Sequence, residues 1–179
     1  RSSIVPVIMN IKTGSKVIAM VAPSIVGQFG LKVKPDQIYT ALKMAGFSEV
    51  VEVAIGADIV SVEEAEEYIE KVPEKQPYMT SSCCPAFVDY VRKFHPTMMD
   101  HVSTTVPPMI AIGRAIKAKD PLAKVVFIGP CTAKKVEIKQ PDVKGVIEYV
   151  LTFEELRAMF DGKNLDLAHM DEMQAGEPS

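Results

Sequence analysis

The chain has few of the residue types that define several protein classes. Its 179 residues include no tryptophan, three histidines and only three cysteines, two of which are adjacent. This is not the disulfide framework of a secreted domain, so we expect a cytoplasmic protein. No apolar run reaches the ~18 residues that span a bilayer, and the first residues do not resemble a signal peptide, so no membrane association is expected. A net charge of −3 without an extended basic cluster argues against a nucleic-acid partner.

Short apolar runs alternate with longer segments of helical periodicity, and 47% of the residues are hydrophobic. We expect strands at 16–22, 50–54, 124–128 and 146–151. Helices are expected at 35–45, at 61–71 with a capping box of Ser61 and Glu64, at 85–94, at 108–119, and after Thr152, which pairs with Glu155. This succession predicts an α/β fold, mainly a parallel sheet with helices on both faces. Residues 163–179 lose periodicity and are interpreted as an irregular, truncated end.

The three cysteines occupy two short segments, Cys83-Cys84 before Pro85 and Cys131 after Pro130. Each segment follows an apolar run, as does the segment 22–24, and parallel strands present their carboxyl ends at one edge of a sheet. Cys84 and Cys131 can therefore converge although they are distant in sequence. Thiolates at helix N-termini suit iron, because the exposed N–H groups favour negative charge. The alternative is that all three cysteines are small buried hydrophobic residues, the commonest role of a free cysteine.

The number of cysteines limits the metal site that this chain can build. A cubane iron–sulfur cluster or a structural zinc ion normally takes four side chains. Only three cysteines are present, and two adjacent cysteines do not easily serve one cluster. The histidines are scattered, so the sequence predicts half of a metal site.

Two motifs resemble the catalytic domain of iron-only ([FeFe]) hydrogenases. The segment Ser81-Ser82-Cys83-Cys84-Pro85-Ala86-Phe87 is similar to the family's T-S-C-C-P-x-W motif. The segment Pro130-Cys131-Thr132-Ala133-Lys134-Lys135-x-Glu137 is similar to its M-P-C-x-x-K-x-x-E motif, and Val21-Ala22-Pro23-Ser24 and Ala57-Asp58-Ile59-x-x-x-Glu63-Glu64 also look like family segments. The likeness covers about 16–160. It implies one lobe of that fold, the N-terminal part of the H-cluster domain, with the whole chain 1–179 a partial catalytic domain.

The resemblance implies a cofactor and its ligands. The family binds the H-cluster, in which a cysteine bridges a [4Fe-4S] cubane to a two-iron centre that carries CO, cyanide and a dithiolate. By resemblance, Cys84 and Cys131 ligate the cubane and Lys134 holds a cyanide ligand. Pro23 and Ser24 line the same pocket.

The resemblance also implies an activity, which is the interconversion of H2 with protons and electrons. Cys83 would pass protons to and from the two-iron centre, and Glu67, Ser103 and Glu64 would continue the relay outward. A thiol and carboxylates can carry protons in this way. Ferredoxin or ferredoxin-like domains are the implied electron partners.

The chain departs from the family pattern in ways that bear on function. The motif E-x-M-x-C-x-x-G-C, which supplies two further cysteines, is absent, and so are ferredoxin-like clusters. Phe87, Gly129 and Met109 stand where the family usually has tryptophan, methionine and glutamine. We therefore expect a fragment that is inactive and without its cofactor when isolated, from a divergent branch such as the sensory hydrogenases.

Two alternatives remain at this point. The first is a hydrogenase-like iron–sulfur assembly protein without hydrogenase activity, although such proteins usually lack the cysteine doublet to which Cys83 belongs. The second is an unrelated α/β domain, either a binding module or a redox thiol protein, with structural cysteines. The pKa of the thiols separates the second alternative, because a reactive site depresses it and a buried structural thiol is inert.

Overall fold

A four-stranded parallel sheet forms the centre of the computed structural model, which describes residues 1–172. The strands are β1 (Val17–Val21), β2 (Glu49–Glu52), β3 (Lys124–Ile128) and β4 (Tyr149–Leu151), in the order β2-β1-β3-β4. In the register, Ala19 of β1 lies between Val50 and Val126. Every residue of β1 is buried, as expected for a central strand that is covered on both faces. The predicted α/β class is confirmed.

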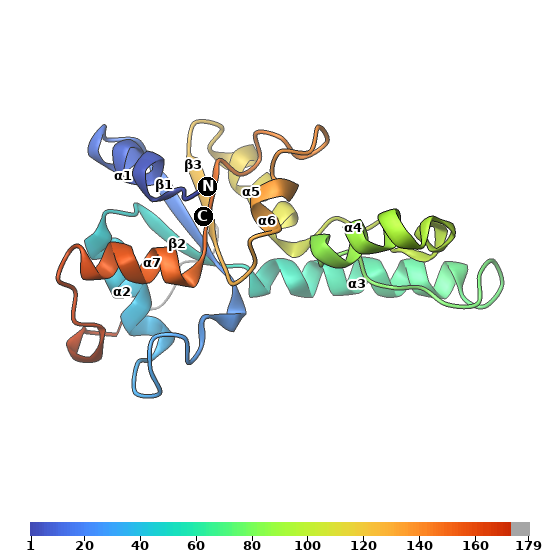
Figure 1. Ribbon diagram of the computed structural model, residues 1–179, viewed down its shortest axis with the longest axis horizontal. Helices are drawn as coiled ribbons and strands as arrows, with labels where there is room; N and C mark the ends of the chain where they lie inside the picture. The colour runs from blue at the N-terminus through green and yellow to red at the C-terminus, as the bar shows by residue number, and fades with distance from the viewer. Residues whose placement is uncertain (173–179) are drawn as a thin grey trace.

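Helices cover the sheet on its two faces (Figure 1). On one side α7 (Phe153–Asp161) packs against both α1 (Ile4–Lys12) and α2 (Pro35–Ala45), and on the other side α5 (Pro108–Lys119) packs against β3. The helix α2 ends where predicted, because Gly46 follows it with φ +109, a left-handed conformation that glycine adopts without strain. The helix α1 was not predicted, although the apolar residues Ile4, Val7 and Ile11 recur at helical spacing and pack on the core.

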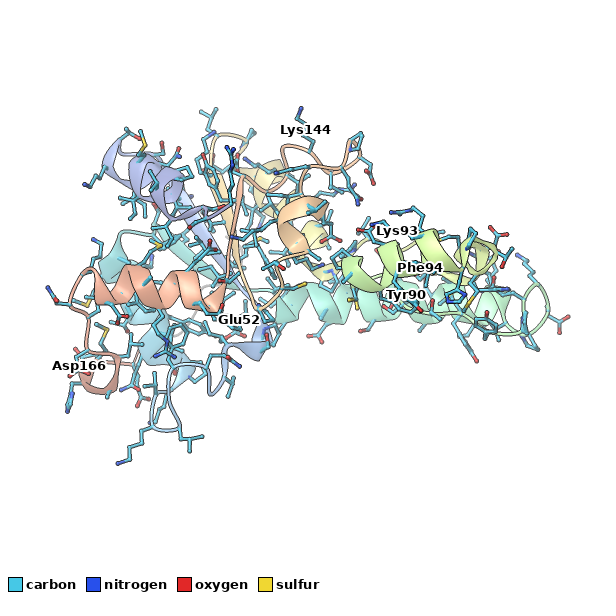
Figure 2. The ribbon with its side chains drawn as sticks, viewed as in Figure 1. Glu52, Tyr90, Lys93, Phe94, Lys144 and Asp166 are labelled. Carbon is cyan, nitrogen blue, oxygen red and sulfur yellow. The ribbon has the colours of Figure 1, made fainter. Side chains whose placement is uncertain are left out.

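Two helices extend away from the sheet as an arm, which we define as α3 (Ala54–Lys71) with α4 (Pro85–Phe94) (Figure 1). The base of α3 packs against α5, and α4 packs against the 3-10 helix η2 (Pro96–His101). Figure 2 shows Tyr90 and Phe94 on α4. The exposed fractions of these two residues are 54% and 66%. The arm therefore contributes little to the central core and presents apolar side chains to solvent.

Some predicted boundaries are wrong. The capping box at Ser61 does not exist, because α3 begins at Ala54 directly after β2, and the Ser61 hydroxyl donates to the Ala57 carbonyl oxygen inside the helix at 2.7 Å. The strands expected at 50–54 and 146–151 are shorter. The apolar run before the cysteine pair is no sheet strand, since only Thr80 pairs, in an isolated bridge with Val102. Val53 and Ala54 belong to the start of α3 instead, and residues 146–148 precede β4.

The final helix was predicted correctly at its start. The Thr152 hydroxyl oxygen accepts a hydrogen bond from the Glu155 N–H at 3.2 Å, and the Glu155 carboxylate accepts one from the Thr152 N–H at 2.9 Å. The segment expected to be irregular contains the 3-10 helix η3 (Leu167–His169), which Gln37 holds through the Met170 carbonyl oxygen at 3.1 Å. The rest of that expectation, at 173–179, lies outside the described residues.

The remaining short helices follow β1 and β3. The 3-10 helix η1 (Pro23–Ile25) comes directly after β1, and the single turn α6 (Lys134–Glu137) follows the Cys131 segment. Within 1–172, no helix combines the length and apolar character needed to cross a bilayer.

Candidate functional site

The loops that follow β1 and β3 open at the topological switch point of the sheet. These strands are neighbours, but the chain leaves β1 toward β2 and leaves β3 toward β4. In open α/β sheets, ligands bind in the crevice where the connections diverge in this way. The Ala22 N–H donates to the Ile128 carbonyl oxygen at 2.9 Å, which fixes the two loops relative to each other. The segments with Pro23 and Cys131 thus start at the same edge, as predicted.

A cavity of about 180 Å³ lies at this edge. Its lining residues come from the loops after β1 and β2, from the starts of α3, α5 and α6, from β3 and from the cysteine doublet: Ala22, Pro23, Val53, Ala57, Cys83, Pro108, Met109, Phe127 and Lys134. Two of these side chains are polar, the Cys83 thiol and the Lys134 ammonium. The site is therefore a mostly apolar space with one proton donor and one cation, a composition typical of ligand sites.

Lys134 is held in place from two directions. Its ammonium donates to the Cys83 carbonyl oxygen at 2.9 Å and lies 2.8 Å from a carboxylate oxygen of Glu137. The two side chains are only 11% and 8% exposed. Burial raises the pKa of Glu137, while its ion pair with Lys134 acts in the opposite direction. The contact to Cys83 connects the two cysteine-containing motifs in space and places a positive charge on the cavity wall.

The cysteines are accessible rather than part of the core. Cys83 and Cys84 are exposed, Cys131 is half-buried, and all three are free thiols. The hypothesis that all three are buried hydrophobic residues is therefore wrong. Cys84 is the N-cap residue of α4, with Pro85 at the first helical position, as the sequence predicted. Within residues 1–172, no group of three or more His, Cys, Asp or Glu side chains could hold a metal ion.

Glu67 on α3 is the most heavily hydrogen-bonded of the predicted relay residues. Its carboxylate accepts from the Ser103 hydroxyl at 2.6 Å, the Lys71 ammonium at 2.6 Å, the Thr104 N–H at 3.0 Å and the Thr104 hydroxyl at 2.8 Å. Burial acts to raise its pKa, but these donors outweigh burial and hold the pKa well below its usual range. Glu67 and Ser103 are thus in direct contact, and the carboxylate stays ionised at neutral pH.

Glu64 belongs to a separate group. It accepts a hydrogen bond from the Ser81 hydroxyl at 2.9 Å, and the Ser81 oxygen accepts one from the Cys83 backbone N–H at 3.3 Å. Among the described residues, no direct hydrogen bond joins this group to Glu67 and Ser103. The four proposed relay residues therefore lie in two hydrogen-bonded groups, Glu64 with the Cys83 backbone through Ser81, and Glu67 with Ser103, rather than in one continuous chain.

A second cavity, of about 300 Å³, lies beside the first. Ser82, Ser103 and Glu137 all contribute to its lining. It therefore reaches from the Glu67–Ser103 group to the carboxylate that holds Lys134. The lining of this cavity mixes polar and apolar side chains. A space of this size can hold ordered water at its polar side chains, and such water can bridge groups that do not touch directly.

The cavity lining differs from the sequence prediction at one residue and adds others to which the sequence analysis gave no role. Pro23 lines the first cavity, whereas Ser24 is exposed and is not among the lining residues. The sequence analysis included Glu137 in the second motif but gave it no role. Its i,i+3 spacing from Lys134 on a helix was nevertheless a signal in the sequence for an ion pair between the two side chains. The contribution of Phe127 to the cavity depends on packing, so the sequence carried no signal for it.

Comparisons with known proteins connect this arrangement to a family. The model of the family described as "Iron only hydrogenase large subunit, C-terminal domain" matches residues 15–179. Iron hydrogenase 1 of Clostridium pasteurianum is 30% identical over 89% of this chain and 31% of its own length. The periplasmic [Fe] hydrogenase large subunit of Nitratidesulfovibrio vulgaris is 31% identical over 87% of this chain and 42% of its own length. The chain thus spans less than half of these relatives.

Two further similarities extend the comparison. The cytosolic Fe-S cluster assembly factor NAR1 of Kluyveromyces lactis is 30% identical over 54% of this chain and 21% of its own length. An apo [FeFe]-hydrogenase HydA1 from Chlamydomonas reinhardtii, variant C377H, has the same fold, with a TM-score of 0.89 over 99% of this chain and 52% of that chain at 23% identity. Given the family match over nearly the whole chain, the protein belongs to the family formed by the C-terminal domain of iron-only hydrogenase large subunits.

Proposed function

We propose that this chain supplies one half of an H-cluster site, in a full-length protein that interconverts H2 with protons and electrons. One observation carries the proposal: the thiol of Cys83 and the ammonium of Lys134 line a single apolar cavity at the switch point of the sheet. A thiol can exchange protons near neutral pH, and an ammonium can bind an anionic ligand. By itself the chain has two of the four ligands of a cubane cluster, so we expect the isolated chain to be inactive.

The residues at this edge fit the cofactor in part. Cys84 and Cys131 would ligate the cubane, and their position at the starts of helices and loops leaves both thiols accessible. Lys134 would hold an anionic ligand of the two-iron group, and Pro23, which lines the same cavity, would lie beside it. The bound cofactor supplies the redox chemistry and the binding of hydrogen. The protein supplies a low-polarity space, in which electrostatic interactions are stronger than in water.

The protein's own groups would move the protons. Cys83 would hold a proton at its sulfur atom and exchange it with the groups on the arm side of the doublet, Glu64, Glu67 and Ser103. Since Glu67 is held as a carboxylate, it would act as the acceptor to which the Ser103 hydroxyl donates. Water in the second cavity would bridge the two hydrogen-bonded groups.

Partners and context complete the proposal. Protons and H2 are the proposed substrates of the full-length protein, and ferredoxin or a ferredoxin-like domain is its proposed electron partner. A hydrogen sensor would use the same site. We place the protein in the cytoplasm because its cysteines do not form disulfides, although one of its relatives is described as periplasmic.

The second candidate function is iron–sulfur cluster assembly. The similarity to NAR1 favours it, because it shows that the family extends to such factors. An assembly factor needs cluster ligands such as Cys84 and Cys131 but has no use for a proton-carrying thiol at Cys83. Cys83 and its cavity therefore favour the hydrogenase.

Iron content of the full-length protein tests the assignment of the ligands. The protein is purified without oxygen, and iron and sulfide are measured for the wild type, for Cys84→Ala and Cys131→Ala, and for Cys83→Ala as the matched control. We expect the first two variants to lose cubane iron, because ligand loss sharply lowers metal affinity, and the control to retain it. Equal iron in all four proteins would overturn the ligand assignment.

A further inference from the structure

Gly129 has no space for a side chain. A Cβ atom at this position would lie 2.7 and 2.8 Å from Cε1 and Cζ of the Phe127 ring and 3.3 Å from Cβ of Ala22. Carbon atoms at van der Waals contact are ~3.5–4.0 Å apart, so the first two contacts are severe overlaps. Gly129 is not among the glycines with a positive φ. The position therefore requires glycine for space and not for backbone conformation.

The Phe127 ring occupies the volume that this missing side chain would take. Residues two apart on an extended chain point to the same face of a sheet, and the Gly129 N–H continues the ladder by donating to the Leu151 carbonyl oxygen at 3.0 Å. The ring of Phe127 therefore leans toward the carboxyl end of β3, with its far edge beneath Gly129. Phe127 is only 5% exposed, so the ring has little freedom to move away.

The Phe127 ring also forms the sheet-facing end of the first cavity. Of the lining residues, Phe127 is the one that belongs to a strand, while the others come from helices and loops around the strand ends. Met109, which is 2% exposed, adds a second apolar wall. Neither side chain can donate a hydrogen bond, so this side of the cavity offers apolar contacts.

We propose that Phe127 and Gly129 form a coupled pair that sets the depth of the cavity and determines the size of the group bound in it. The cavity accepts a compact group whose sheet-facing end makes only apolar contacts and whose polar contacts come from Cys83 and Lys134. This inference deepens the proposed function and rests on it for the identity of the group. The coupling itself belongs to the metal-free chain, so it can be tested without any cofactor.

A double-mutant cycle in thermal stability tests the coupling. In the metal-free chain, we expect Gly129→Ala to lower the melting temperature by about 2 to 12 °C, because overpacking a core displaces the ring. In a Phe127→Ala background the same change should cause almost no further loss, because the obstructing atoms are gone. Phe127→Leu replaces Phe127→Ala if the latter does not fold. An equal loss from Gly129→Ala in both backgrounds would refute the coupling.

A second tight glycine provides a matched control. A Cβ at Gly113 would lie 2.8 Å from Cγ1 of Val146, a distance close to those at Gly129 but to a different neighbour. Gly113→Ala should therefore destabilise the chain by the same amount with and without the Phe127 ring. Rescue of Gly113→Ala by the Phe127 variant would show a general loosening of the core and would overturn the specific coupling.

Xenon binding tests whether the pair sets cavity depth. Apolar cavities bind xenon, and ¹²⁹Xe NMR titration of the metal-free chain measures this binding. We expect the Phe127 variant to bind xenon several-fold more tightly than the wild type. Adding Gly129→Met in that background should reverse the gain, because the new side chain refills the space. Equal xenon affinity in the wild type and the Phe127 variant would overturn the proposal, whereas failure of iron loading in the full-length protein would count only against the proposed function.

Discussion

Replacement of Glu67 by glutamine tests how the arm is anchored to the loop that carries Ser103. The carboxylate accepts hydrogen bonds from Lys71, Ser103 and Thr104, and the Thr105 hydroxyl adds another at 3.2 Å. Glutamine has one acceptor oxygen and no charge, so several of these donors lose their partner. Hydrogen bonds to charged groups contribute ~1.5–3 kcal/mol each, and partial compensation reduces the sum. We expect Glu67→Gln to lower the free energy of unfolding by about 2–4 kcal/mol.

Urea unfolding followed by circular dichroism measures this loss, with Glu66→Gln as the matched control. Glu66 lies next to Glu67 on the same helix but is exposed, so its replacement should change stability by less than about 0.5 kcal/mol. A loss as small for Glu67→Gln as for Glu66→Gln would refute the hydrogen-bond network as an anchor of the arm.

The pH dependence of the same variant checks the direction of the pKa shift. The pKa of Glu67 is lower in the folded chain than in the unfolded chain, where it is near 4.3. Its contribution to stability is therefore complete above that pH and is lost as the pH falls through the folded value. The difference in stability between the wild type and Glu67→Gln should shrink between pH 5 and pH 3. A difference that stays constant over this range would contradict the shift.

Three further predictions rest on single contacts. Lys134→Met should destabilise the metal-free chain by about 2–4 kcal/mol in chemical unfolding, because it leaves the buried Glu137 carboxylate unpaired; an unchanged stability would contradict the ion pair. Thr152→Ala should cost about 1 kcal/mol in the same assay by removing the cap of α7, and a neutral effect would refute that role. Iodoacetamide should alkylate the exposed Cys83 faster than the half-buried Cys131 in mass spectrometry, and the reverse order would contradict their placement.

The sequence predicted the central part of the fold because its strands are buried on both faces. Such strands are short apolar runs, and 16–22 and 124–128 coincide closely with β1 and β3. The start of α3 was missed for a physical reason. Its first turns carry Ala54, Gly56 and Ala57, none of which has a side chain that can cap a helix N-terminus. Ser61 has such a side chain, but its hydroxyl donates to the Ala57 carbonyl oxygen inside the helix.

The arm and the cavity show a second limit of sequence reasoning. The two cysteine-containing segments do meet, since Lys134 contacts the Cys83 carbonyl oxygen, but the expected reason holds for only one of them. The Cys131 segment follows a strand of the parallel sheet, whereas the run before Cys83 forms only the isolated bridge between Thr80 and Val102. Glu64 and Glu67 belong to different hydrogen-bonded groups because their partners, Ser81 and Ser103, lie in different loops between α3 and α5. The role of Phe127 depends on the absence of a side chain at Gly129. Neither relation has a periodic signature, so only the three-dimensional structure could reveal them.

Hydrogen isotope exchange by the full-length protein is the sharpest test of the proposed activity. The anaerobically purified, iron-loaded protein is placed under H2 in D2O, and the release of HD and D2 is measured by mass spectrometry. We expect exchange by the wild type and at least a ~100-fold loss in Cys83→Ala at unchanged iron content, because a positioned proton-carrying group contributes ~10²–10⁴-fold. An iron-loaded wild-type protein that exchanges no isotope would contradict hydrogenase activity and leave cluster assembly as the function of this site.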